Sequence, residues 1–77
     1  MDINEFVIAF AELLEDVDTS GITAATKFKD FAAWDSMTVL LVLSMIKTKY
    51  GVIIPALDVN NCTTIADIYA LVEKAHG

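Results

Sequence analysis

The stretch DSMTVLLVLSMIKTKYG, residues 35–51, decides the fold of this 77-residue chain. At 100° per residue its apolar side chains gather on one side, and we predict an α-helix over Ser36–Tyr50. Gly51 is expected to end this helix, after Lys47 and Lys49 in the last turn, where the helix dipole favours cations. The predicted core face consists of Val39, Val42, Leu43, Ile46 and Tyr50.

A first helix is predicted before this stretch. Asp2 followed by Glu5 is typical of a helix start, with Asp2 as the cap. Helical spacing then carries the helix to about Leu14 or Glu15. The apolar residues at this spacing are Ile3, Phe6, Val7, Phe10, Leu13 and Leu14.

The remaining segments predict a loop and two more helices. DVDTSGITAAT is rich in turn formers and is expected to be a long loop. Pro55 suits a short helix that begins near Ala56, and Thr63 or Thr64 is expected to cap a last helix, with Asp67 at a capping-box spacing. The buried stripe of that helix is predicted to be Ile65, Ile68, Tyr69 and Val72. The fold class is therefore all-α, a four-helix bundle with a long loop after the first helix and a short third helix.

Composition narrows the class of protein further. The 56% hydrophobic content predicts a packed core, and the length predicts one domain over residues 1–77. Phe28 and Phe31 are expected to hold the long loop against that core. A single cysteine, Cys62, allows no intrachain disulfide and is expected to be a small buried filler, and no Cys/His cluster predicts a metal site.

Charge and hydropathy exclude several functions. The start MDINEF lacks the basic residues of a signal peptide, and the longest apolar run, residues 37–46, is too short to span a bilayer. We expect a cytoplasmic monomer that does not bind membranes. The net charge is −6, and residues 1–26 hold six acidic residues without a base, so the chain is expected not to bind nucleic acid.

Ser36 has two interpretations. Asp-Ser before an apolar run is common at helix starts, so the two residues alone favour a helix cap. The order of features along the chain favours a role for Ser36 beyond capping. The features are a helix, a long loop, Asp35-Ser36-Met37 at the start of a second helix, Ile54-Pro55, and Thr63-Thr64-Ile65 at the start of the last helix. Together these features resemble the acyl carrier protein family, over nearly the whole chain.

The resemblance implies a function. In that family the serine of the Asp-Ser-hydrophobic motif receives 4′-phosphopantetheine from coenzyme A, so Ser36 would be the attachment site, flanked by Asp35 and Met37. The exposed start of a helix suits an attached phosphodiester, because free N–H groups and the dipole favour negative charge. A phosphopantetheinyl transferase, an acyl- or aminoacyl-loading enzyme and synthases that use the tethered acyl group are the implied partners. The protein itself would not be an enzyme.

The second helix departs from the family pattern. Many fatty-acid carriers have a glycine where Ala32-Ala33-Trp34 stands here, and several acidic residues on this helix, where none follows Asp35. Met37, Leu40, Leu41, Ser44, Met45 and Thr48 fall away from the predicted core face. These residues either pack under the neighbouring loop or form an apolar docking patch. The expected partner-binding residues are Met37, Leu40, Leu41, Ser44 and Lys47.

Two alternatives stay open at this point. Within the family, the missing acidic residues keep an aminoacyl, peptidyl or D-alanyl carrier in view, and a dedicated or secondary pathway is favoured over housekeeping fatty-acid synthesis. Outside the family, Asp16, Asp18 and Ser20 resemble the first half of a calcium-binding loop. Lys27 stands where that loop needs a bidentate glutamate, so a calcium-binding or purely structural helical module is the weaker interpretation.

Overall fold

The computed structural model describes residues 2–14, 21–31 and 34–76. Its elements are α1 (Ile3–Glu12), the 3₁₀-helix η1 (Phe28–Asp30), α2 (Ser36–Tyr50), α3 (Ala56–Asn60) and α4 (Ile65–His76). The predicted all-α class is confirmed, and the described ranges contain no strand. None of the helices in these ranges is long and apolar enough to cross a membrane.

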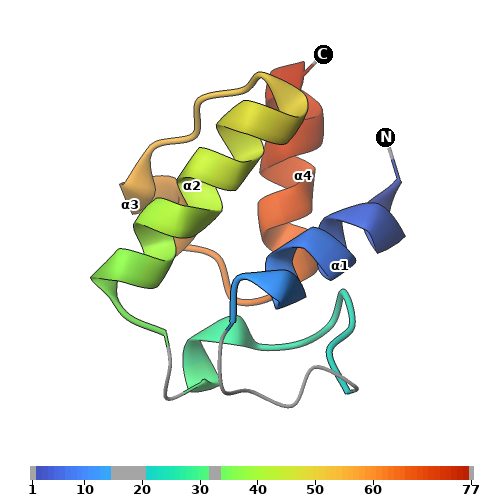
Figure 1. Cartoon of the computed structure of the whole chain (residues 1–77), viewed down its shortest axis with the longest axis vertical. Helices are drawn as coiled ribbons and strands as arrows, with labels where there is room; N and C mark the ends of the chain where they lie inside the picture. Colours follow the sequence, from blue (N-terminus) through green and yellow to red (C-terminus); the bar gives the residue numbers. More distant parts are fainter. Residues whose placement is uncertain (1, 15–20, 32–33, 77) are drawn as a thin grey trace.

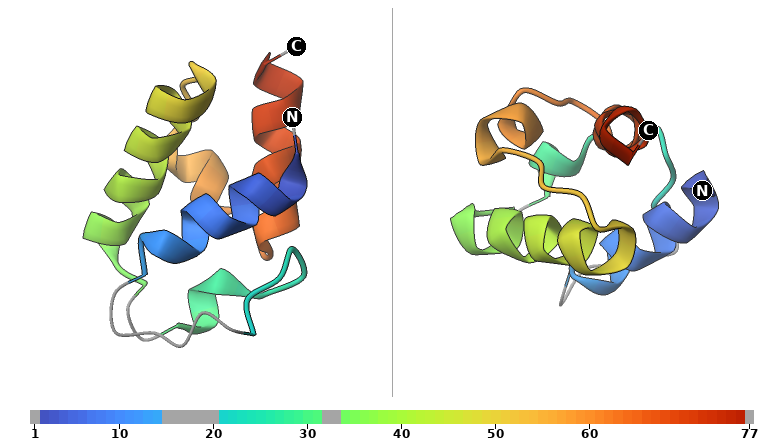
Figure 2. Two further views of the ribbon diagram at one scale, coloured as in Figure 1. Left: turned by 45° about the vertical axis from the view of Figure 1, so that its right-hand side comes forward. Right: turned by 90° about the horizontal axis from the view of Figure 1, so that it is seen from above.

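The helices surround one core. Figure 1 shows α2 and α4 running in the same general direction, with α1 crossing them and the short α3 beside the middle of α2. The views of Figure 2 show the segment around η1 closing the end of the bundle where α2 and α4 begin. The starts of α2 and α4 therefore share one end of the molecule.

The first helix is shorter than predicted. Its start is as expected, since the Asp2 carboxylate accepts a hydrogen bond from the Asn4 N–H at 2.9 Å. Its end comes at Glu12, because the Leu13 N–H donates to the Phe10 carbonyl at 3.1 Å, an i→i−3 bond that tightens the last turn. Leu14 is still buried, with 4% of its surface exposed.

The start of α4 is stabilised from two sides. The Asp67 carboxylate accepts hydrogen bonds from the N–H groups of Thr63 and Thr64 at 3.0 and 3.1 Å, while the Thr64 hydroxyl accepts from the Asp67 N–H at 3.3 Å. This is the predicted capping box, closed by aspartate instead of glutamate. In addition, the N–H groups of Ile65 and Ala66 donate to carbonyls of the long loop at Thr26 and Ala24. The loop is thus fixed to α4 through its backbone.

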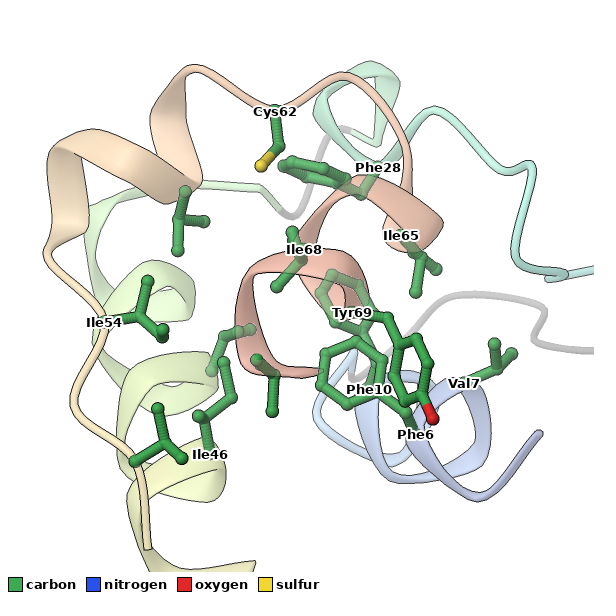
Figure 3. Packing of buried hydrophobic residues seen from close by; sticks show 14 of the residues in the cluster. Phe6, Val7, Phe10, Phe28, Ile46, Ile54, Cys62, Ile65, Ile68 and Tyr69 are labelled. Atoms are coloured by element: carbon green, nitrogen blue, oxygen red, sulfur yellow. The ribbon is translucent and has the colours of Figure 1, made fainter. Parts of the chain in front are cut away.

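Aromatic rings dominate the core. Phe6 and Phe10 of α1 are fully buried, and Phe6 contacts Tyr69 of α4 with ring centres 5.6 Å apart. Phe28 is also fully buried and meets Phe10 edge-on, with ring centres 5.8 Å apart. Figure 3 shows Phe28 and Cys62 at one side of this cluster and Ile46 and Ile54 at another. Phe28 therefore anchors the loop, as the sequence predicts.

Cys62 behaves as the predicted filler. The side chain is 7% exposed, and its thiol donates to the Asp58 carbonyl at 3.3 Å. Burial raises the pKa of the thiol, so the thiol form is favoured.

Gly51 allows α2 to end. Its φ is +69°, in the left-handed region, and a β-carbon at this position would meet nothing within 4 Å. Backbone strain is therefore the main cost of a larger residue here.

We predict that Gly51→Ala lowers the free energy of unfolding by about 1 kcal/mol, measured by urea denaturation. Gly21→Ala is the control, because Gly21 is equally open and has no positive φ, and an equal loss in both variants would contradict the argument.

Candidate phosphopantetheine attachment site

Ser36 is the first residue of α2, and its side chain is exposed. It is not the helix cap that its position also allowed. The cap is Asp35, whose backbone is extended and whose carboxylate accepts from the Thr38 N–H at 2.9 Å and from the Thr38 hydroxyl at 3.0 Å. Aspartate takes this role because its side chain reaches the N–H three residues ahead, which leaves the serine one position inside the helix.

The electrostatics of the helix start follow from this arrangement. The hydrogen bonds from the Thr38 N–H and hydroxyl lower the pKa of Asp35, because they stabilise its charged form. The carboxylate thus occupies the Thr38 N–H, one of the donors that the sequence argument left free for a phosphodiester. The helix dipole still favours negative charge at Ser36.

A hollow of about 450 Å³ adjoins Ser36. Its walls come from three segments: Trp34 before α2, Val39 and Leu40 on α2, and Ala56 and Asn60 on α3. We call it the Ser36 hollow. Sequence reasoning missed the α3 residues, although the Pro55 signal that predicted a helix here was the available indication of this wall.

Contacts from the loop hold two walls of the Ser36 hollow in place. Trp34 stacks on Phe10, with ring centres 5.9 Å apart and planes inclined by 14°, and meets Phe28 edge-on at 4.6 Å. On the other side, the Lys29 ammonium donates a hydrogen bond to the Asn60 carbonyl at the end of α3. Both walls are therefore fixed to the segment around η1.

The outer face of α2 is exposed rather than covered by the loop. The exposed fractions are 63% for Met37, 60% for Leu40 and 43% for Leu41. Ser44 and Lys47 are exposed as well, so these five predicted partner-binding residues share an open face. One sequence assignment was wrong: Met45 is half-buried and packs against the core.

Two exposed apolar residues were not singled out from the sequence. Ile53 precedes Pro55 and Leu57 lies on α3, with 77% and 69% of their surfaces exposed. Leu57 lies on a helix too short for a reliable apolar stripe, and Ile53 lies between helices, so no periodic signal marked either one.

The residues at the site fit a phosphopantetheine arm. The Ser36 hydroxyl lies at the surface, and the neighbouring hollow offers apolar walls together with Asn60. A linear arm with amide groups suits such a lining, since apolar contact and a few polar partners are what ligand hollows provide.

No metal site accompanies the hollow in the described ranges 2–14, 21–31 and 34–76, where no group of three potential ligands comes together. The calcium-loop candidates Asp16, Asp18 and Ser20 lie outside the described residues.

Comparison with known proteins identifies the family of the chain. The family model described as "Phosphopantetheine attachment site" matches residues 5–72. The chain therefore belongs to the phosphopantetheine-binding carrier family, whose prosthetic group is 4′-phosphopantetheine.

The relatives found by comparison are acyl carrier proteins. The meromycolate extension acyl carrier proteins of Mycobacterium tuberculosis and Mycobacterium bovis are 32% identical over 73 residues, which is 91% of this chain and 64% of theirs. That of Mycolicibacterium aurum is 30% identical over 91% of this chain and 75% of its own length. The chain thus spans somewhat less than two thirds of the first two relatives.

The lowered pKa of Asp35 predicts a pH dependence. A carboxylate with a depressed native pKa contributes stability above its unfolded value of about 4, and this contribution is lost as the pH falls through the native value. We predict that Asp35→Asn has a lower thermal midpoint than the parent at about pH 7, and that the difference shrinks toward about pH 3. Asn also caps helices, so the comparison isolates the charge. A difference that stays constant over this range would contradict the assignment.

Proposed function

We propose that Ser36 is the residue that carries 4′-phosphopantetheine. The main support is the geometry: an exposed serine hydroxyl at the first position of α2, beside a hollow that fits the arm, with Asp35 acting as the helix cap. When bound, the arm supplies a terminal thiol that holds an acyl group as a thioester. The chain supplies the attachment oxygen, the hollow and the surface for partners.

The attachment step needs a phosphopantetheinyl transferase and coenzyme A. The Ser36 hydroxyl oxygen forms a new P–O bond to the phosphorus that bears the pantetheine, and the pyrophosphate P–O bond of coenzyme A breaks. The nucleotide leaves as adenosine 3′,5′-bisphosphate, and the serine proton passes to the transferase or to water. The carrier takes part only as the acceptor.

The proposed cargo is an acyl intermediate. The supporting observation is that the relatives are named as acyl carriers for meromycolate extension, which points to fatty-acid-like chains in a dedicated pathway. An aminoacyl, peptidyl or D-alanyl carrier stays the second candidate, because the sequence of α2 has no acidic residue from Ser36 to Tyr50. Loading the modified protein with acyl and aminoacyl donors distinguishes the two.

The proposed docking surface is the open face of α2 formed by Met37, Leu40, Leu41, Ser44 and Lys47. A transferase, a loading enzyme or a synthase that reaches the arm must cover the neighbours of Ser36, and three of them are exposed apolar side chains. Apolar clusters of this kind are where partners bind. Tethering raises the effective concentration of the cargo for any enzyme that docks here.

We further propose that residues 1–77 form one carrier domain and that the protein is a cytoplasmic monomer without catalytic activity of its own.

Modification at Ser36 is testable by mass. Incubation with coenzyme A, Mg²⁺ and a broad-specificity phosphopantetheinyl transferase is expected to add one phosphopantetheine group to the parent and none to Ser36→Ala. Because Asp35 caps α2, Ser36→Ala is expected to fold, which circular dichroism checks. Folded parent protein that gains no mass with several transferases would leave Ser36 as a structural residue.

Docking is testable with the same reaction. We predict that Leu40→Asp lowers kcat/KM for phosphopantetheine transfer by at least about tenfold, because an apolar contact is replaced by a charge. Ile8→Asp is the matched control: Ile8 on α1 is exposed to nearly the same extent, 59% against 60%. A loss in Lys47→Glu as large as that in Leu40→Asp would contradict a mainly apolar surface.

A further inference from the structure

A second hollow lies on the other flank of α2. It measures about 310 Å³, and we call it the α1–α2 groove. Leu13 at the end of α1 forms one wall, and the rest comes from α2. Its lining residues are Leu13, Leu41, Ser44, Met45, Thr48 and Lys49. The Ser36 hollow shares none of these residues, so the exposed ridge of α2 separates two distinct depressions.

The groove combines an apolar floor with a cation. Leu13 and Met45 pack against the core, and Leu41 is part of the exposed face. Lys49 is the charged residue of the lining. Its ammonium lies 5.9 Å from the ring centre of Tyr50, and no carboxylate of residues 2–14, 21–31 or 34–76 pairs with it. The lining therefore offers an apolar contact beside a positive charge that no carboxylate of the described residues pairs with.

The groove is close enough to Ser36 to be covered by an enzyme. At 1.5 Å per residue, Leu41 and Met45 lie about 8 and 14 Å from Ser36 along the helix axis. A standard interface covers about 800 Å² on each partner, which corresponds to a radius of about 16 Å. An enzyme centred on Ser36 thus extends over the Leu41 and Met45 part of the groove, and one whose contact extends along α2 toward its C-terminal end also reaches Lys49, about 20 Å from Ser36.

We propose that enzymes acting on this carrier anchor an apolar side chain in the α1–α2 groove and place a carboxylate beside Lys49. This inference rests on the carrier function proposed above and names the chemistry of the partner surface. Charge complementarity carries it: the sequence from Ser36 to Tyr50 holds two lysines and no acidic residue, in a chain whose net charge is −6. The apolar contact gives affinity, and the ion pair sets orientation and selectivity.

The first test uses small probes that mimic such a surface. 4-Phenylbutyrate and 4-phenylbutylamine share an apolar body and differ in the sign of their charge. In NMR titrations, we expect 4-phenylbutyrate to shift the methyl resonances of Leu13, Leu41 and Met45 and to bind at least about threefold more tightly than the amine. The overall negative charge favours the amine everywhere else, so this preference would report the local lysine.

Variants make the titration decisive. Lys49→Gln is expected to remove the preference for the carboxylate, and Lys49→Glu to reverse it. Lys74→Glu is the matched control, because Lys74 also lies in the last turn of an exposed helix end, on α4. Equal binding of both probes to the parent, or shifts confined to Val39 and Leu40, would overturn the proposal. So would groove shifts that depend on protein concentration without any probe, because they would assign the groove to a second copy of the chain.

The second test uses an enzyme. With the phosphopantetheinyl transferase, Lys49→Glu is expected to lower kcat/KM about threefold through a higher KM, and Lys74→Glu to leave it unchanged. An unchanged KM in Lys49→Glu, with full modification of the parent, would overturn the proposal. A parent that gains no mass would instead overturn the carrier function, while the probe titrations would still report on the groove.

Discussion

The contact of the Phe28 ring with Phe10 and Trp34 is the interaction on which the rest of the structure depends. Among the described residues between α1 and α2, Phe28 is fully buried, and its ring contacts Phe10 of α1 and Trp34, which lies just before α2. Truncating a buried phenylalanine to alanine typically costs about 3–5 kcal/mol. This is a large part of the roughly 4–12 kcal/mol that a domain of this size has in total. The same ring also positions Trp34, which is a wall of the Ser36 hollow.

The candidate site therefore depends on several elements of the fold at once. α2 supplies Ser36 and the open face, α3 supplies the opposite wall of the Ser36 hollow, and the segment around η1 fixes both through Trp34 and the Lys29–Asn60 hydrogen bond. The carbonyls of Ala24 and Thr26 join the same segment to α4. The described part of the loop between α1 and α2 therefore keeps the starts of α2 and α4 together at one end of the molecule (Figure 2).

The sequence predicted those features that depend on local chemistry. The bounds of α2, the start of α3, the capping box at Thr64 and Asp67 and the buried stripe of α4 were all correct, because spacing and caps act within a few residues. Features that depend on long-range packing were not accessible. Periodicity alone assigned Met45 to the outer face, whereas Met45 is half-buried against the core and lines a groove together with Leu13, the residue that follows α1. The α3 wall of the Ser36 hollow likewise exists only once α3 lies against α2.

The different positions of Asp35 and Ser36, the first as the cap of α2 and the second as its first residue, have an evolutionary consequence. Because the carboxylate of Asp35 caps α2, the start of the helix does not rely on the Ser36 hydroxyl. Loss of the hydroxyl would leave the fold, both hollows and the exposed face of α2 intact. If Ser36 carries the arm as proposed, a gene copy with that change would encode a folded competitor that occupies the same enzymes without accepting cargo. A single substitution would thus turn such a carrier into an inhibitor of its own pathway.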